Sequence, residues 1–330
     1  MNEEMPTIPN SELRIPNLLV IAGPTASGKT ALSVELAKRL DGEVVCADSM
    51  QVYRDFQIIT ARVTEEEMQG VPHHLTGFLP LEKSFSVAEW ADMARKCIAD
   101  IWQRGKLPIV CGGTGLYIST LLDNIVFEDR GADPERRREL EAFAEENGRH
   151  ALWERLSALD PEAAAEIHEN NVKRVVRAIE VCETTGQGFY EQRRQNLKGG
   201  SPYNAYVLTI GYEDRAELYE RIDRRVDVML AQGMADEARR VYETGDPATA
   251  YQAIGYKELI PYLAGEKTLE ECADKIRLGT RHYAKRQLTW FRRIEGIETF
   301  FRQKDENIEI FFEKVQKGIA KSNILCYNKR

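Results

Sequence analysis

Residues 23–30 read Gly23-Pro24-Thr25-Ala26-Ser27-Gly28-Lys29-Thr30 and match the pattern G-x-x-x-x-G-K-[ST] at every position. An unbroken apolar run, residues 18–22, precedes this stretch, and a run with helical spacing, residues 31–40, follows it. A strand, a glycine-rich loop and a helix in that order favour a phosphate-binding loop over an ordinary turn without a ligand. In such a loop the backbone amides and the helix N-terminus attract the anion, Lys29 adds a positive charge, and Thr30 can bind Mg²⁺.

A nucleotide-hydrolysing protein with such a loop also has an acidic residue, at the end of another core strand, that orients Mg²⁺. This sequence lacks an acidic residue at the expected place. The strand predicted over 107–111 runs into Gly112-Gly113-Thr114-Gly115, which contains no carboxylate. The acid that does follow a predicted strand, residues 43–47, is Asp48. The loop is therefore expected to hold phosphate groups beside a single carboxylate that lies where an acceptor would bind.

The length of 330 residues allows one large or two ordinary domains. No apolar run reaches the roughly 18 residues of a membrane span. The polar residues 1–17 lack the apolar core of a secretion signal and are predicted to form a flexible tail. The cysteines form no C-x-x-C pair, which argues against zinc and disulfides. We therefore expect a cytoplasmic protein without membrane contact.

Positive charge is concentrated near the C-terminus, although the formal net charge of −8 argues against a nucleic-acid partner. Residues 275–293 contain seven Lys or Arg residues, one His and no acid. Over 281–292 these cations alternate with aromatic residues, as in proteins that bind single-stranded nucleic acid. From charge alone, a solvated helix face explains the segment equally well.

The order of predicted elements indicates an α/β fold. A helix predicted from Ser86, with a capping box to Glu89, leads into the strand at 107–111, and such β-α-β order produces a doubly wound parallel sheet. Residues 129–202 are helical in pattern, and a strand returns at 205–210. We predict a P-loop NTPase-like core, residues 18–128 and 203–330 with C-terminal helices, interrupted by an all-helical insertion domain at 129–202.

Polar residues at the ends of the predicted strands are the candidates for chemistry, because ligands of such sheets bind there. Asp48 can face the crevice or close an Asx-turn. Gln51 could pair with the N6 and N7 edge of an adenine. Gly112 and Gly113 allow a backbone to approach a ligand closely, or form a plain turn. The adjacent His73 and His74 favour a loop role over metal binding.

A set of motifs, in this order, makes the chain recognisable: GPTASGKT, DSMQVY, VPHHL, GGTGLY, ADPERR, KRVVRAIE, QAIGYKE and TRHYAKRQLTWFR. Together they closely resemble the bacterial tRNA dimethylallyltransferases, also called tRNA isopentenyltransferases, from about Leu18 to Arg293. The resemblance implies transfer of a dimethylallyl group from dimethylallyl diphosphate to N6 of adenosine 37, next to the tRNA anticodon, with Mg²⁺. It thereby explains the missing acid, because the loop would hold a diphosphate leaving group rather than a nucleotide to be hydrolysed.

The resemblance also implies roles for individual residues. Lys29, Thr30, Mg²⁺ and the amides of the loop from Gly23 to Thr30 would stabilise the departing diphosphate. Asp48 would accept the N6 proton, and Thr114 would contact the target nucleotide. Arg221 or Arg224 would help to clamp the diphosphate, and the sequence does not choose between them.

The tRNA-contacting segments of the family match several parts of this chain. By resemblance, the expected contacts are Asp48, Ser49, Met50, Gln51, Thr114, Arg136, Lys173, Arg174, Val175, Val176, Arg177, Gln252, Ala253, Ile254, Gly255, Tyr256, Lys257, Lys285, Arg286, Gln287, Leu288, Thr289, Trp290, Phe291 and Arg292. No protein partner is indicated, and a monomer is expected.

Three other functions stay open from the residues alone. The first is transfer of the same group to free AMP, ADP or ATP, which needs neither the insertion nor the basic segment. The second is a small-molecule kinase with Asp48 as base, against which the Gly112-Gly113 strand end counts. The third is a non-catalytic nucleotide switch, for which Asp48 would have no chemical use.

Overall fold

The computed structural model describes residues 15–125, 134–196, 200–245, 248–304 and 306–322. It divides into two compact units, Met1–Leu122 with Ser201–Arg330, and Asp123–Gly200. We call these the core unit and the insertion unit. Of the tail expected over residues 1–17, residues 1–14 lie outside the described residues, and Asn17 belongs to the first strand instead.

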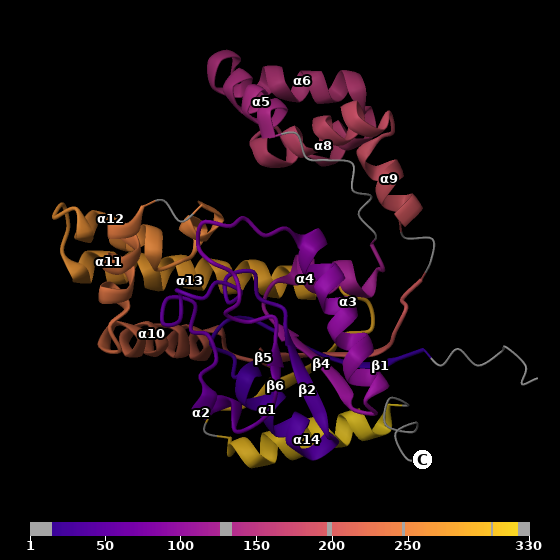
Figure 1. The fold of residues 1–330 in the computed structure, drawn as a ribbon, viewed down its shortest axis with the longest axis vertical. Helices are drawn as coiled ribbons and strands as arrows, with labels where there is room; N and C mark the ends of the chain where they lie inside the picture. Colours follow the sequence, from indigo (N-terminus) through magenta and orange to yellow (C-terminus); the bar gives the residue numbers. More distant parts are fainter. Residues whose placement is uncertain (1–14, 126–133, 197–199, 246–247, 305, 323–330) are drawn as a thin grey trace, which may run out of the picture. The chain divides into compact units, whose positions relative to one another are not determined.

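A six-stranded parallel sheet forms the centre of the core unit and confirms the predicted α/β fold (Figure 1). Its strands lie in the order β3-β2-β4-β1-β5-β6. Their bounds are β1 Asn17–Ala22, β2 Gly42–Cys46, β3 His73–His74, β4 Leu107–Gly112, β5 Asn204–Tyr212 and β6 Glu298–Arg302. The pair His73-His74, predicted as a loop, thus extends one edge of the sheet beside Val44 and Val45.

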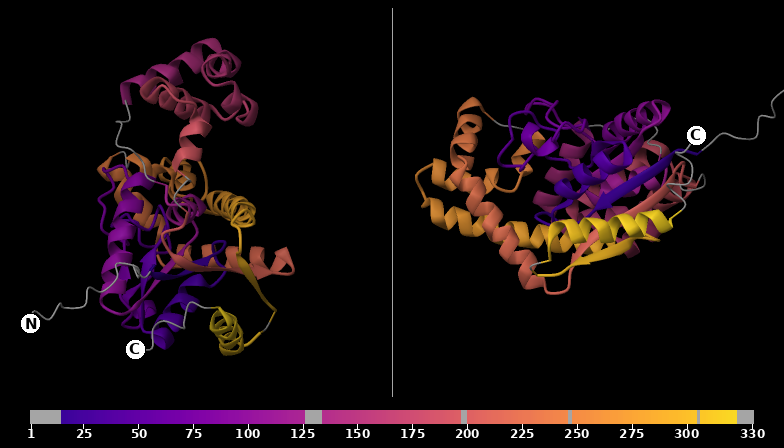
Figure 2. Two further views of the ribbon diagram at one scale, coloured as in Figure 1. Left: turned by 90° about the vertical axis from the view of Figure 1, so that its right-hand side faces the viewer. Right: turned by 90° about the horizontal axis from the view of Figure 1, so that it is seen from below.

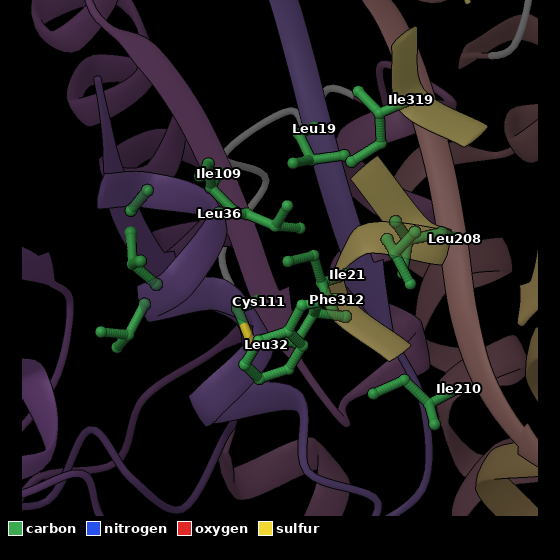
Figure 3. Packing of buried hydrophobic residues seen from close by; sticks show 14 of the residues in the cluster. Leu19, Ile21, Leu32, Leu36, Ile109, Cys111, Leu208, Ile210, Phe312 and Ile319 are labelled. Atoms are coloured by element: carbon green, nitrogen blue, oxygen red, sulfur yellow. The ribbon is translucent and has the colours of Figure 1, made fainter. Parts of the chain in front are cut away.

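Helices cover both faces of the sheet, which makes it doubly wound as predicted. On one face, α1 (Lys29–Leu40) and α14 (Ile308–Lys321) pack on Leu19, Ile21 and Ile109, as Figure 3 shows. On the other face, α3 (Val87–Gln103) and α4 (Gly115–Leu122) pack on Leu18, Val20 and Val110. Successive residues of a strand point to opposite faces, so both sets of side chains in β1 and β4 must be apolar.

The segment after β2 packs on a second group of helices. This group consists of α10 (Arg215–Ala231), α11 (Met234–Thr244), η1 (Ala248–Gln252), α12 (Tyr256–Leu263) and α13 (Leu269–Phe291). Tyr53 and Phe56 of the segment are buried in one cluster with Met234, Tyr256 and Leu259. A short helix, α2 (Glu65–Met68), follows the segment. The polypeptide between β2 and β3 is thereby held in a defined path above the sheet edge.

The insertion unit is all-helical and has its own apolar core. Its helices are α5 (Pro134–Asn147), α6 (Arg149–Leu159), α7 (Pro161–Glu166), α8 (Val172–Thr185) and α9 (Phe189–Asn196). Asp160 caps α7 by accepting from the Ala163 amide at 3.0 Å and also accepts from the Phe189 amide at 2.7 Å. The unit spans 123–200, compared with the 129–202 expected from the sequence.

None of the helices in the described part of the chain is long and apolar enough to cross a membrane. The C-terminal helix α14, yellow in Figure 2, instead lies along the core unit. Phe311, Phe312, Val315 and Ile319 form its buried face.

Removal of one buried ring from α14 tests this packing. We expect Phe311→Ala to lower the free energy of unfolding by about 3–5 kcal/mol, because a fully buried phenyl ring is lost and a cavity is left. Ile310→Ala is the matched control, because Ile310 is 60% exposed on the same helix. Denaturant unfolding of both variants measures the difference, and equal losses would contradict the packing described.

Candidate active site

The loop of residues 23–30 joins the end of β1 to the start of α1. Gly28 is the N-cap of α1 with a φ of 96°, a left-handed conformation that favours glycine. The Lys29 ammonium donates to the Pro24 carbonyl at 2.6 Å, so the side chain folds back over the loop. The Thr25 amide donates to Oε1 of Gln287 from α13 at 2.9 Å. The Lys29 side chain and the distant helix α13 therefore both fix the conformation of the loop.

A cavity of about 830 Å³ lies beside this loop at the carboxyl ends of β2 and β4. Its walls are the loop itself, residues 48–51, the turn at 57–64, and side chains from α10, α12 and α13. Asp48, Lys29 and Thr30 all line it. The structure therefore places the strand-end carboxylate and the phosphate-binding loop in one cavity, as the general rule for such sheets predicts.

Two cations converge on the cavity. Burial lowers the pKa of Lys29 to about 8, and the nearby charge of Arg225 acts in the same direction. Burial also lowers the pKa of Arg225, whose Nη2 donates to the Ala61 carbonyl at 3.3 Å. Neither side chain forms an ion pair within the described residues, so both are available to an anion in the cavity.

Arg225 lines the cavity, whereas Arg221 and Arg224, the two residues expected to clamp the diphosphate, do not. Arg224 is exposed and does not line the cavity, so the structure does not support it as the clamp of a diphosphate. Arg221 donates through Nε to the Ala26 carbonyl at 2.9 Å and braces the loop from outside. The sequence does carry a signal, because Arg225 adjoins Val226 in the buried stripe Leu218, Ile222, Val226 and Met229 of α10.

Asp48 fulfils both of the roles considered for it. Its Oδ1 accepts from the amides of Met50 at 2.9 Å and Gln51 at 3.4 Å, which closes an Asx-turn after β2. The carboxylate also lines the cavity, and within the described residues Oδ2 has no hydrogen-bond donor. One oxygen therefore fixes the loop while the other is available to a ligand. Ser49 and Met50 line the same wall.

The Gln51 side chain lines the cavity and is hydrogen-bonded to neighbouring residues. Its Nε2 donates to the carbonyls of Thr60 at 3.2 Å and Ala61 at 3.3 Å, and its Oε1 accepts from the Cys46 thiol at 3.6 Å. Pairing of this amide with an adenine edge would require these hydrogen bonds to be exchanged, and it stays a prediction. Gln51 instead ties the turn at 57–61 to the end of β2.

The glycine-rich end of β4 accommodates a helix. A Cβ on Gly113 would lie 2.2 Å from Nε2 of Gln287, which donates to the Gly113 carbonyl at 2.9 Å. Gly113 therefore allows a close approach of α13, and Gly112 allows a close approach of the Ala47 backbone after β2. Both glycines also line the cavity. Thr114 accepts at Oγ1 from the Ser49 amide at 3.0 Å and joins this strand end to the Asp48 turn.

The residues of the basic segment of α13 lie in different surroundings. Arg286 is exposed and lines the cavity, whereas Gln287 and Phe291 are buried. The Trp290 indole donates to the Ser119 hydroxyl at 2.9 Å. The remaining residues face a separate pocket of about 100 Å³ beside α10, namely Lys285, Leu288, Thr289 and Arg292. Arg286 is therefore exposed to a ligand in the cavity, whereas Phe291 packs in the core, and the contact of either residue with tRNA stays a prediction.

The segment from Gln252 into the first turn of α12 also contains both buried residues and residues that line the cavity. Ala253 and Tyr256 are buried, and Gly255 donates its amide to Glu258 at 2.7 Å. The residues of this segment that line the cavity are Gln252, Ala253, Ile254 and Lys257.

In the insertion unit, the valines of the expected contact segment belong to the core. Val175 and Val176 are 0% and 1% exposed and pack in the core of this unit, and their contact with tRNA stays a prediction. The cations around them are exposed, namely Lys173, Arg174 and Arg177. Arg136 carries two acidic partners, Glu183 at 2.6 Å and Glu139 at 2.9 Å. The helical periodicity of α8 already separated these two sets, since buried positions recur every three or four residues.

A Mg²⁺ ion in this cavity would be coordinated mostly by a bound diphosphate and by water rather than by side chains. Among the described residues, no cluster of three or more His, Cys, Asp or Glu side chains could hold a metal. The Thr30 hydroxyl lines the cavity at the start of α1, and within the described residues it has no hydrogen-bond partner. One hydroxyl beside a phosphate-binding loop fits an ion that arrives with a diphosphate, because Mg²⁺ keeps phosphate oxygens and waters as ligands.

The fold and this site define an α/β protein with a phosphate-binding loop and a helical insertion. The sequence model of the IPP transferase family matches residues 51–294, and that of the isopentenyl transferases matches residues 16–75. The chain is 47% identical over 304 residues to a tRNA dimethylallyltransferase of Halalkalibacterium halodurans, covering 92% of this chain and 96% of that one. It is 45% identical over 308 residues to the tRNA dimethylallyltransferase of Bacillus subtilis, with the same coverage.

Solved structures agree with the sequence comparisons. A full-length tRNA isopentenylpyrophosphate transferase from Bacillus halodurans superposes with a TM-score of 0.70 at 44% identity, over 94% of this chain and 97% of that one. A eukaryotic dimethylallyltransferase acting on tRNA gives a TM-score of 0.80 at 31% identity, over 96% and 80%. The chain therefore belongs to the IPP transferase family.

The lowered pKa of Lys29 predicts a pH dependence. The affinity for inorganic pyrophosphate should fall as the pH rises through about 8, because the free protein then loses the Lys29 proton. Calorimetric titration from neutral pH to about pH 10 measures this, and Lys29→Arg should flatten the decline because guanidinium stays charged there. An undiminished decline in Lys29→Arg would assign the dependence to another group.

Arg225 and Arg224 form a matched pair on α10. We expect Arg225→Ala to weaken pyrophosphate binding by about 10- to 100-fold, because a charge-assisted contact is lost. Arg224→Ala removes an equal charge from an exposed position and should leave the affinity nearly unchanged. The same calorimetric titration compares both variants, and equal losses would mean that only net charge matters.

Proposed function

We propose that the protein transfers a dimethylallyl group from dimethylallyl diphosphate to N6 of adenosine 37, next to the anticodon of tRNA. The relatives named above are tRNA dimethylallyltransferases, and they match nearly the whole chain. The observation that carries the proposal is the shared cavity of the phosphate-binding loop, Lys29, Arg225 and Asp48. It provides cations for a leaving diphosphate and a carboxylate for the attacking amine.

The diphosphate binds to the loop amides, with Lys29 and Arg225 on its charged oxygens. When the bond between the allylic carbon and the diphosphate oxygen breaks, the electron pair leaves with the diphosphate. The two cations stabilise that charge because they are already positioned where it develops. The Thr30 hydroxyl would hold Mg²⁺ beside the loop, and the ion would supply further positive charge to the leaving group.

Asp48 acts on the acceptor. The adenine N6 attacks the allylic carbon, the new N–C bond forms, and Oδ2 of Asp48 accepts the proton that N6 releases. Oδ1 stays engaged with the amides of Met50 and Gln51, which holds the carboxylate in one orientation. The adenosine must leave its stack to reach this carboxylate, which costs a few kcal/mol and less in a loop than in a duplex.

The tRNA is held by exposed cations. In the core unit these are Arg286 and Lys257, both at the cavity. In the insertion unit they are Lys173, Arg174 and Arg177. Such contacts go mostly to phosphates and position the anticodon loop. The protein acts in the cytoplasm as a monomer.

A single labelling experiment tests the proposal. Labelled dimethylallyl diphosphate is incubated with unmodified tRNA that carries adenosine 37, with the same tRNA carrying guanosine 37, and with AMP. Label on the first tRNA alone is the expected result. Label on AMP alone would instead identify synthesis of a free prenylated nucleotide, and no label with ATP consumption would identify a kinase.

The role of Asp48 has its own prediction. Asp48→Asn retains an oxygen that can accept from the Met50 amide but cannot take up the N6 proton. We expect turnover to fall by about 10²- to 10⁴-fold, with tRNA and pyrophosphate binding retained. Single-turnover kinetics with saturating tRNA measures the chemical step, and turnover at the wild-type rate would exclude Asp48 as the base.

A further inference from the structure

Glu237 is a buried carboxylate outside the cavity. It lies in the first turn of α11 and is 4% exposed. Its oxygens accept hydrogen bonds from three successive backbone amides, Gln57 at 3.1 Å, Ile58 at 2.9 Å and Ile59 at 2.8 Å. In the described part of the chain it forms no ion pair with Lys, Arg or His. The amides alone therefore compensate its charge.

A carboxylate in this place does more than join a helix to a loop. Apolar contacts already hold the segment, since Ile59 packs in the same cluster as Met234 and Tyr256. Burial of an ionised group is unfavourable unless hydrogen bonds satisfy it, so a carboxylate buried here constrains all three donors at once. Converging amides of this kind form an anion nest that fixes the backbone conformation.

The other end of the same turn carries the cavity side chains. The Ala61 carbonyl accepts from Nη2 of Arg225 at 3.3 Å and from Nε2 of Gln51 at 3.3 Å. Ala61 has a φ of 46°, a left-handed conformation that is unfavourable for a residue with a Cβ. Surrounding contacts must therefore hold the turn in this shape, and Glu237 supplies the hydrogen bonds at its first half.

We propose that Glu237 is a positioning residue for the transfer reaction: it fixes the turn of residues 57–61, whose Ala61 carbonyl sets Arg225 and Gln51 at the cavity. Gln51 follows Asp48 in the Asx-turn and donates its amide to the Asp48 carboxylate. A shift of the turn therefore reaches both the cation that faces the diphosphate and the loop that carries the base. The inference rests on the proposed function, because it concerns the same cavity.

Kinetics of Glu237→Gln test this positioning role. The amide keeps the size of the side chain, but its NH₂ group faces backbone donors and cannot accept from them. We expect kcat/KM for dimethylallyl diphosphate to fall by about 10- to 100-fold, as for other small misplacements of catalytic groups. The dissociation constant for tRNA, measured by filter binding without the prenyl donor, should stay within about twofold of wild type.

Two controls separate positioning from loss of folding. Asp236→Asn removes a neighbouring exposed acid from the same helix and should leave all constants unchanged. Glu237→Asp keeps the charge and should fold, but its carboxylate is one methylene short, so kcat/KM should lie between wild type and Glu237→Gln. Circular dichroism and a thermal midpoint for each variant establish the folded fraction, to which all rates are normalised.

A double-mutant cycle with Arg225→Lys tests the route. If Glu237 acts through the Ala61 carbonyl, the combined loss should be clearly smaller than the product of the two single losses. Multiplicative losses, or wild-type constants in folded Glu237→Gln and Glu237→Asp, would overturn the inference. A wild-type protein that leaves tRNA unlabelled would overturn the proposed function instead, so the two failures are distinct.

Discussion

The side chain of Gln287 joins three segments that lie far apart in the sequence. From α13 it accepts from the Thr25 amide in the phosphate-binding loop and donates to the Gly113 carbonyl at the end of β4, each at 2.9 Å. It is 4% exposed, so these bonds form away from solvent, where an unpaired amide would be unfavourable. The loop, the sheet and α13 are thereby fixed to one another. The cavity exists because α13 closes it, and the residues of α10 and α12 reach the cavity by packing on α13.

The electrostatic character of the cavity follows from this closure. Lys29 and Arg225 are held close together without a paired acid in the described residues, and burial lowers the pKa of both. Such an arrangement opposes folding, since two like charges lose water and repel each other. It favours binding of an anion, because within the described residues neither cation has to leave an ion pair first. Asp48 lines the same cavity, and the Asx-turn fixes the orientation of its carboxylate through Oδ1.

Much of the fold was accessible from the sequence because its signals are local. The loop from Gly23 to Thr30, the capping box at Ser86 and the helical pattern of the insertion each depend on neighbours within a few residues. The short edge strands β3 and β6 depend on pairing with distant strands, and no periodicity of two residues marks them.

The sequence predicts the candidate site only in part, and the differences from the structure have a common cause. The resemblance predicts tRNA contacts for whole motif segments. In a helix, however, only every third or fourth residue faces the core, and the residues between face solvent. Val175, Tyr256 and Phe291 are therefore buried beside exposed cations, and Arg225 rather than Arg224 reaches the cavity. The role of Gln51 could not be predicted, because the carbonyls it binds belong to a turn whose shape depends on Glu237, nearly 180 residues away.

The position of the insertion has a consequence for synthesis of the chain on the ribosome. β1 lies between β4 and β5 in the sheet, but β5 is made only after the whole insertion unit. During that interval one edge of β1 has no partner, and such an edge is prone to pair with other chains. The insertion unit has its own core and can fold while it waits, since domains fold as units during synthesis. Chaperones that shield extended apolar strands would therefore have their longest period of action on this nascent chain between completion of β4 and arrival of β5.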